Sequence, residues 1–307
     1  MLLRFTVLAS GSGGNASLVE VDGFGVLLDA GLGPRQLAAR LASVGLSWAR
    51  VQAVVLTHIH SDHWKDRTLA HLRQRRVPLY CHPDHHEYLA AYSPAFGVLV
   101  ASGLVRTFAA GGEIVLAPGL RCRPLPIRHD GGATFGFRFE GKADLFGQSA
   151  ALGYVTDLGC WDEALADALA DADLVAIEFN HDEEMERTSG RHPELIARVL
   201  GDEGHLSNTQ AAALLRAVLA RTPVGRLRHV VQLHLSRECN HPKLARAAAQ
   251  AVLAETNGVR LHTAEQDWSG ETLLLGNGAD GPRKLGVPTR RPVQAATEQP
   301  LLPGLGG

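Results

Sequence analysis

The chain has 307 residues, of which 45% are hydrophobic, and its formal net charge at pH 7 is −2. This length and composition fit one large domain or two small ones with a substantial apolar core. The near-neutral charge excludes a general electrostatic attraction to nucleic acid, so any contact with a polyanion must be local.

The cysteines and the short apolar runs bear on the compartment in which the protein works. No two of the four cysteines form a Cys-x-x-Cys pair: they are Cys81, Cys122, Cys160 and Cys239. The first apolar run is short and contains Arg4, so it does not resemble a secretory signal peptide. No run reaches the roughly 20 apolar residues that a membrane-spanning helix needs. We therefore expect a cytoplasmic protein with reduced thiols and no membrane segment.

The first predicted elements are two strands around a glycine-rich turn. Residues 3–8 predict a strand, and residues 11–16 then match Gly-x-Gly-x-x-Ala, the pattern of a dinucleotide-binding turn. That pattern requires a helix next, whereas residues 17–22 alternate as a strand does, so we reject a dinucleotide site. The turn either presents backbone N–H groups to an anion or only reverses the chain.

A later turn carries the densest group of candidate metal ligands. Residues 51–56 predict a buried strand, and four polar residues follow it: His58, His60, Asp62 and His63. An extended backbone points His58 and His60 to the same side. Imidazole and carboxylate ligands suit zinc, manganese or iron. Four ligands this close would crowd one ion, so the spacing predicts two ions, with the first two histidines on one. The alternative interpretation is a polar, pH-sensitive turn.

The pattern His-x-His-x-Asp-His after a strand resembles the signature of the metallo-β-lactamase superfamily. The resemblance covers about residues 1–276 and implies an α/β fold, a four-layer αββα sandwich, with a metal site at one sheet edge. It does not select a substrate, because the superfamily includes lactamases, thioesterases, lactonases, nucleases and oxidoreductases. We expect one domain over residues 1–276. Residues 277–307 are rich in Gly, Pro and Gln and lack periodicity, so we expect a disordered tail there.

Two segments downstream of the metal-ligand turn have alternative interpretations. Residues 65–76 predict a basic helix whose charges are either solvated or in contact with phosphate. His82, His85 and His86 either form a second metal cluster or only accompany the start of a helix near Pro83.

The hydrophobic pattern predicts the remaining elements in chain order. Residues 98–140 are expected to alternate short strands with glycine and proline turns. The other strands are expected over 25–28, 77–80, 150–155, 173–179, 228–233, 259–263 and 272–275. Helices are expected over 34–44, 162–170, 192–201, 207–221 and 242–256.

The resemblance also implies the remaining metal ligands, each placed just after an apolar strand. His129 precedes a glycine turn and is the implied third ligand of the first ion. Asp157 follows a strand and a threonine, as His58 does, and is the implied bridging carboxylate; its alternative role is a helix cap. His234 is the implied missing ligand of the second ion. The full expected set is His58, His60, Asp62, His63, His129, Asp157 and His234.

Several further motifs resemble one branch of the superfamily, the YycJ/WalJ-like proteins. They are the segments 9–15, Ala-Ser-Gly-Ser-Gly-Gly-Asn; 178–182, Glu-Phe-Asn-His-Asp; 204–208, Gly-His-Leu-Ser-Asn; and 234–236, His-Leu-Ser. The branch consists of bacterial single-domain proteins regarded as DNA exonucleases. The interval from His129 to His234 has no room for the extra domain of ribonuclease J relatives, and we see no arm like that of ribonuclease Z relatives.

This branch implies a nuclease with two divalent metal ions. Asp62 and Asp157 would remove about two of the four positive charges that the ions bring, which leaves a site suited to a phosphodiester. A hydroxide that bridges the ions would attack phosphorus. The candidate catalytic residues are Asp62, His205 and His181, of which the two histidines would contact phosphate or protonate the leaving oxygen. The candidate substrate contacts are Asn15, Asn208 and His205.

We therefore expect a metal-dependent phosphodiesterase, a DNA exonuclease of 5′-to-3′ polarity by resemblance, with nucleic acid as its partner. One alternative is a dinuclear esterase, lactonase or thioesterase that acts on a small molecule, and another is an RNA-processing nuclease. A third alternative is a metal-stabilised nucleic-acid-binding module without activity. A ligand set that leaves a position open for water argues against this third alternative, because structural zinc sites are closed.

Overall fold

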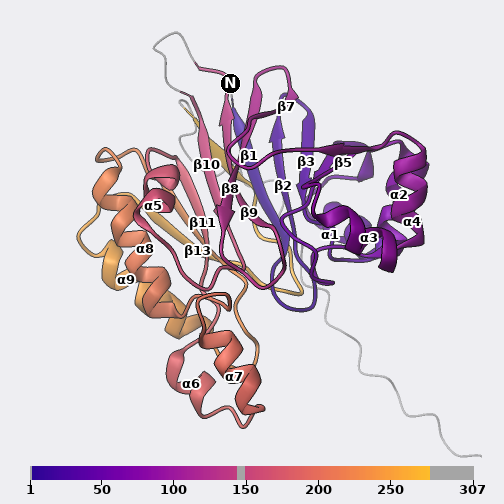
Figure 1. Cartoon of the computed structure of the whole chain (residues 1–307). Coiled ribbons are helices and arrows are strands. Elements are labelled where there is room, and N and C mark those ends of the chain that lie inside the picture. The colour runs from indigo at the N-terminus through magenta and orange to yellow at the C-terminus, as the bar shows by residue number, and fades with distance from the viewer. Residues whose placement is uncertain (1, 144–148, 277–307) are drawn as a thin grey trace, which may run out of the picture.

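Two seven-stranded sheets lie face to face between two layers of helices in the computed structural model, which describes residues 2–143 and 149–276 (Figure 1). The first sheet has the order β14-β1-β2-β3-β4-β5-β6. Its strands are β1 Leu3–Ala9, β2 Ala16–Val21, β3 Phe24–Leu28, β4 Val51–Val55, β5 Leu79–Cys81, β6 Val105–Thr107 and β14 Leu273–Leu275. Strands β3 to β6 are parallel, whereas β1 pairs antiparallel with β2 and β14.

The second sheet repeats this plan, with the order β13-β12-β11-β10-β9-β8-β7. Its strands are β7 Ile114–Ala117, β8 Leu120–Ile127, β9 Thr134–Gly141, β10 Ala151–Val155, β11 Leu174–Glu178, β12 His229–Leu233 and β13 Arg260–Thr263. Strands β10 to β13 are parallel, and β7 to β10 pair antiparallel. Parallel strands point their carboxyl ends to the same edge, so side chains that follow them can meet there.

The helices cover the outer face of each sheet. The helices of the first half are α1 Pro34–Ser43, the short 3₁₀ helix Trp48–Arg50, α2 Asp66–Arg75, α3 His85–Tyr92 and α4 Pro94–Ala101. Those of the second half are α5 Glu163–Leu169, α6 Glu183–Arg187, α7 Pro193–Leu200, α8 Asn208–Arg221 and α9 Pro242–Leu253. Figure 1 shows α1 to α4 on one side of the sheets, α5, α8 and α9 on the other, and α6 and α7 projecting beyond them. None of these helices combines the length and hydrophobicity needed to cross a membrane.

The central strands are apolar at nearly every position because both of their faces are buried. In β2, Val19 and Val21 pack into the cluster between the sheets, whereas Leu18 packs into the cluster beneath the first helices. Successive side chains of a strand point to opposite faces, so a strand between two apolar layers needs apolar residues at nearly every position. These central strands form the rigid frame that carries the polar turns at the sheet edge.

The predicted four-layer αββα sandwich is confirmed, and β2 follows the glycine turn, as the rejection of a dinucleotide site required. The expectation of strands over 98–140 is wrong at its start, because residues 98–101 belong to α4. Ser93 caps this helix by accepting a hydrogen bond from the Phe96 amide, and Pro94 occupies its first turn. The short helix α6 was not predicted. Residues 277–307, expected to form a tail, lie outside the described residues.

Candidate metal centre

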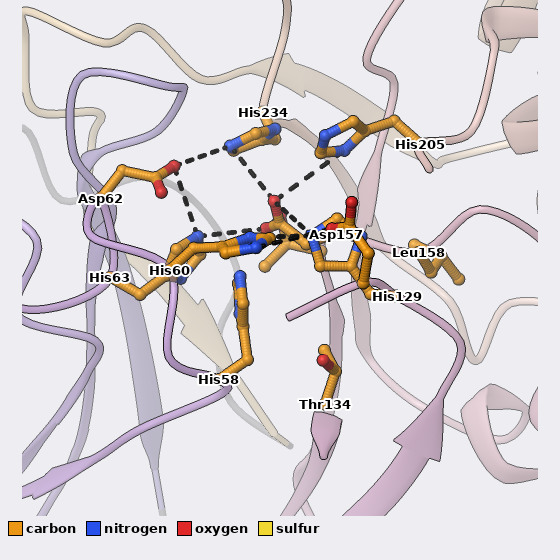
Figure 2. Close-up of polar contacts among 12 residues, drawn as sticks. His58, His60, Asp62, His63, His129, Thr134, Asp157, Leu158, His205 and His234 are labelled. Atoms are coloured by element: carbon orange, nitrogen blue, oxygen red, sulfur yellow. Dashed lines mark hydrogen bonds and ion pairs between the residues drawn. The ribbon is translucent and has the colours of Figure 1, made fainter. Parts of the chain in front are cut away.

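All seven predicted metal ligands come together at one edge of the sheets (Figure 2). Four follow β4, and the others follow β8, β10 and β12. Gly31 follows β3 and allows the turn after β4 to approach closely, because a Cβ atom on Gly31 would lie 1.7 Å from the Asp62 carbonyl oxygen. Next to this contact, the Asn15 amide donates to that same carbonyl at 2.8 Å.

Three histidines form the first group, and their ring nitrogens lie within 4.8 Å of one another: His58, His60 and His129. Nδ1 of His129 donates to the Gly204 carbonyl at 2.9 Å, which leaves its Nε2 lone pair facing the group. Nε2 of His58 is buried and has no hydrogen-bond partner among the described residues. A buried nitrogen without a partner is costly, and a metal ion at this point would satisfy it.

Two carboxylates and two histidines form the second group: Asp62, His63, Asp157 and His234. Nε2 of His63 lies 3.3 Å from Asp157 and 3.5 Å from Asp62. Nε2 of His234 lies 3.4 Å from Asp157 and 3.5 Å from Asp62. Asp157 also faces the first group, with Oδ1 at 4.0 Å from Nε2 of His129. Its carboxylate therefore lies between the two groups, and Asp162, not Asp157, caps the helix that follows.

Buried partners orient the ligands of the second group. Nδ1 of His63 lies 2.8 Å from Oδ2 of Asp29. The side-chain amide nitrogen of Asn15 donates to Asp62 at 3.1 Å and lies 3.0 Å from Nε2 of His63. An amide N–H can only donate, so Nε2 of His63 accepts and Nδ1 carries the proton that Asp29 binds. This is the tautomer that a metal ligand requires. The side-chain amide of Asn180 positions His234 differently: it donates to the His234 carbonyl oxygen at 2.9 Å and lies 3.1 Å from Nδ1 of the ring.

Charges within the group outweigh the effect of burial on the carboxylates. Burial alone would raise the pKa of Asp62 and Asp157, but the neighbouring histidines hold the pKa of both well below its ordinary value. Burial would lower the pKa of His234, whereas Asp157 and Asp62 raise it to about 10. Both carboxylates are therefore ionised at neutral pH, and a cation that bound to His234 would displace the proton from its ring.

Glu178 and His205 form a pair beside the second group. Nδ1 of His205 lies 2.8 Å from Oε1 of Glu178, and the amides of Leu158 and Leu206 donate to Oε2 of the same carboxylate. Glu178 is fully buried, whereas the His205 side chain is 16% exposed. The His205 ring stacks on that of His234 at 5.3 Å between centroids. Because Nδ1 is occupied, Nε2 of His205 is the nitrogen left for a substrate.

The other predicted catalytic and substrate-binding residues are held inside the protein. His181 is fully buried and neither of its ring nitrogens has a partner within residues 2–143 and 149–276. The side chains of Asn208 and Asn240 hydrogen-bond to each other at 3.0 Å. Asn15 is 1% exposed and accepts from the Gly11 amide in addition to its contacts with the ligands. The roles proposed for these residues at the substrate stay predictions.

Contacts in the structure favour one interpretation for each of two segments, the histidines near Pro83 and the glycine-rich turn. Among the described residues, no group of three or more possible ligands includes His82, His85 or His86, and Nε2 of His85 lies 2.6 Å from the Ala133 carbonyl oxygen. This favours the start of a helix over a second metal cluster. In the glycine turn, the amides of Gly11 and Gly14 already donate within the turn, which favours chain reversal over anion binding.

Sequence reasoning assigned no role to Asp29 or Glu178. Asp29 directly follows β3 and Glu178 ends β11, so both carry the signal that indicated Asp157: a carboxylate at the end of an apolar strand. Three residues that follow strands at the site, Asp29, Asp157 and His234, have positive φ angles of 61°, 57° and 53°. Such backbone geometry is costly for residues with a side chain and is concentrated at functional sites.

Comparison with known proteins places this geometry in context. A model of the beta-lactamase superfamily domain matches residues 25–225. Exodeoxyribonuclease YycJ of Bacillus anthracis is 31% identical over 260 residues, which cover 83% of this chain and 90% of that protein. Exodeoxyribonuclease WalJ of Streptococcus pneumoniae is 29% identical over 276 residues, or 88% of this chain and 95% of that protein. The structure of YhfI from Bacillus subtilis, a metallo-beta-lactamase fold protein, superposes with a TM-score of 0.62 at 15% identity, over 88% of this chain and 99% of that one.

Proposed function

The chain belongs to the metallo-β-lactamase superfamily, as a hydrolase of its YycJ/WalJ-like branch, and we propose that it is a dinuclear metal-dependent DNA exonuclease with 5′-to-3′ polarity. The observation that carries the dinuclear proposal is the place of Asp157. Its carboxylate lies between a group of three histidines and a second group of His63, His234 and Asp62. One carboxylate shared by two ligand sets is the arrangement expected for two adjacent cations.

The residues fit two cations of zinc, manganese or iron. His58, His60 and His129 would hold the first and Asp62, His63 and His234 the second, with Asp157 shared between them. Two observations support this assignment: Nε2 of His58 lacks a partner in the part of the chain that the structure describes, and His63 has the required tautomer. Two bound divalent cations would lower the pKa of a water molecule and stabilise negative charge on the phosphoryl oxygens.

We assign proton donation to His205 in preference to His181. Burial lowers the pKa of His205, but Glu178 opposes it and the net result is a raised pKa. A protonated ring whose Nε2 is free can contact a nonbridging phosphate oxygen and then protonate the leaving oxygen. His181 is fully buried, so it supports this chemistry less well. Asp62, with a side chain 20% exposed, would in addition orient the attacking water by accepting its hydrogen bond.

Cleavage of end-labelled nucleic acids tests this proposal. Single- and double-stranded DNA and RNA are incubated with manganese or with zinc, and the wild type is compared with Asp157→Ala. We expect the wild type alone to release nucleotides stepwise from the 5′ end of DNA. Asp167→Ala, which removes a 69% exposed carboxylate from α5, is the matched control and is expected to cleave as the wild type does.

Two results would refute the proposal in different ways. Preferred cleavage of RNA would indicate an RNA-processing nuclease. No cleavage of any nucleic acid by a protein that binds two metal ions per chain would redirect the search to ester, lactone and thioester substrates.

A further inference from the structure

The segment from α6 to Gly204, which we call the α6–α7 lobe (residues 183–204), is fastened to the turn that carries His129. Figure 1 shows α6 and α7 projecting beyond the other helices of this half. The end of the lobe returns to the site, where the Asp130 amide donates to the Glu203 carbonyl at 3.0 Å and His129 donates to the Gly204 carbonyl. Gly204 is required here, because a side chain would come within 2.2 Å of the Arg198 carbonyl oxygen.

One cation of this lobe reaches the edge of the metal centre. Arg198 lies on α7, and its guanidinium donates through Nε and Nη2 to the two oxygens of Asp130, the second at 2.9 Å. The Arg198 side chain is 50% exposed and that of Asp130 26% exposed. Oδ1 of Asp130 lies 3.5 Å from Nε2 of His60 and 3.5 Å from Nε2 of His129. Only one carboxylate therefore separates the guanidinium from the first metal group.

The charges at this edge favour a role in substrate binding over a role in stability. A half-exposed ion pair contributes little to the free energy of folding. Replacing Asp130 by another anion as the partner of Arg198 therefore costs little. An ionised Asp130 beside the metal centre would repel a phosphodiester unless a cation compensated it. The guanidinium presents a planar fork of donors, which matches phosphate oxygens as well as it matches a carboxylate.

We propose that Arg198 and Asp130 form a phosphate-binding subsite, in which Asp130 holds the Arg198 guanidinium at the edge of the metal centre and a backbone phosphate of the bound strand takes it over. This inference rests on the nuclease function proposed above. The ligand is a phosphate of the nucleotide adjacent to the scissile bond, because the scissile phosphate itself belongs at the metal ligands. The contact is to the strand backbone, so it adds affinity without reading sequence.

The first test measures the binding of a phosphorothioate oligonucleotide, which resists cleavage. Fluorescence anisotropy gives its affinity at several salt concentrations. Arg198→Ala is expected to weaken binding about tenfold and to reduce the slope of log affinity against log salt by about one. Arg198→Lys keeps the charge but not the fork, so it should restore the slope and recover only part of the affinity. Arg187→Ala removes the same charge from an exposed position on α6 of the same lobe and is expected to match the wild type.

The second test compares two substrates by their kinetic constants. For a cleavable oligonucleotide, Arg198→Ala is expected to raise KM more than it lowers kcat. The loss of kcat/KM should be larger on the oligonucleotide than on bis(p-nitrophenyl) phosphate, which has no adjacent phosphate. Asp130→Asn removes the competing anion, so its oligonucleotide affinity is expected to equal or exceed that of the wild type.

Distinct results overturn the inference and the function beneath it. Equal losses on both substrates, or a lower metal content in Arg198→Ala, would show that Arg198 only supports the His129 turn. Weakened binding by Asp130→Asn would contradict the exchange of anions. An oligonucleotide affinity of Arg198→Ala equal to that of Arg187→Ala would overturn the subsite alone, whereas a wild type that neither binds nor cleaves nucleic acid would overturn the proposed function as well.

Discussion

Oδ2 of Asp29 lies 2.8 Å from Nδ1 of His63, and both side chains are completely buried. Asp29 also accepts hydrogen bonds from the amide and hydroxyl of Thr57, which fix its position. The carboxylate thereby turns Nε2 of His63 toward Asp62 and Asp157. A residue 34 positions earlier in the chain than His63 thus sets the orientation of a predicted metal ligand.

Loss of this carboxylate is expected to weaken the second metal position. Asp29→Ala should lower metal affinity about 10- to 100-fold, because His63 loses the partner that fixes its ring and its tautomer. Titration calorimetry of the metal-free protein with zinc measures this loss. Glu194→Ala removes a 92% exposed carboxylate and should bind metal as the wild type does. A folded Asp29→Ala protein that binds two ions with wild-type affinity would contradict this role of Asp29.

Glu178→Gln is expected to lower kcat about 100-fold or more while metal content stays the same. The buried carboxylate holds Nδ1 of His205 at 2.8 Å, so its replacement releases the ring that we assign as proton donor. Steady-state kinetics on DNA, with metal analysis of the same samples, measure both quantities. Glu178 also lies within ligand distance of Asp157, His205 and His234. A loss of bound metal in Glu178→Gln would therefore identify Glu178 as a ligand and not as the group that orients His205.

Removal of the metal ions is expected to destabilise the protein. The first group then keeps a buried His58 nitrogen that has no hydrogen-bond partner within residues 2–143 and 149–276. A ligand present at 1,000 times its Kd stabilises the native state by about 4 kcal/mol. Thermal unfolding after chelation, and after stepwise return of zinc, measures this effect as a rising Tm. His192→Ala, which removes a 72% exposed imidazole, should show the same rise. A Tm that is independent of metal in the wild type would contradict cation binding by these residues.

The predicted metal ligands could be read from the sequence because each occupies a simple position. His58 to His63 are contiguous, and the other three follow apolar strands whose carboxyl ends meet at one edge. The supporting residues were not readable, because their roles depend on contacts across the fold. Asn15, for example, was predicted to contact phosphate, and in the fold its side-chain amide contacts Asp62 and His63. The subsite at Arg198 likewise depends on where α7 returns to the His129 turn.

The fold was predictable because its strands have a simple apolar pattern, and the error in the prediction at α4 has a local cause. Strands such as β2 are buried at every position, because an apolar layer lies on each side of the sheet. The helix α4 was mistaken for strand because its apolar residues include Val98 and Val100, which are 41% and 47% exposed. β-branched residues favour strands, and their exposure on a helix removed the periodicity that identifies an amphipathic helix. The cap at Ser93 and Pro94 was the local signal for a helix.

A pH-dependent contribution to stability is expected outside the candidate metal centre, at the start of β12. Nδ1 of His229 lies 3.1 Å from Nε2 of His262, and Nδ1 of His262 lies 3.1 Å from Glu271. Burial, followed by Arg260 and His262, lowers the pKa of His229 to about 4. An unfolded histidine has a pKa of about 6.5, so below that pH the unfolded state binds more protons than the folded state. The contribution is complete above pH of about 6.5 and is lost as pH falls toward about 4, a change of about 3 kcal/mol.

Urea unfolding of the wild type and of His229→Gln at several pH values between about 7.5 and 4 measures this contribution. The wild type is expected to lose about 3 kcal/mol more than His229→Gln over that range, because the variant has no imidazole to protonate on unfolding. Effects of the site carboxylates and histidines occur in both proteins and cancel in the difference. His192→Gln removes an exposed imidazole and should lose stability in parallel with the wild type. Parallel loss by His229→Gln would show instead that His229 keeps an ordinary pKa in the folded protein.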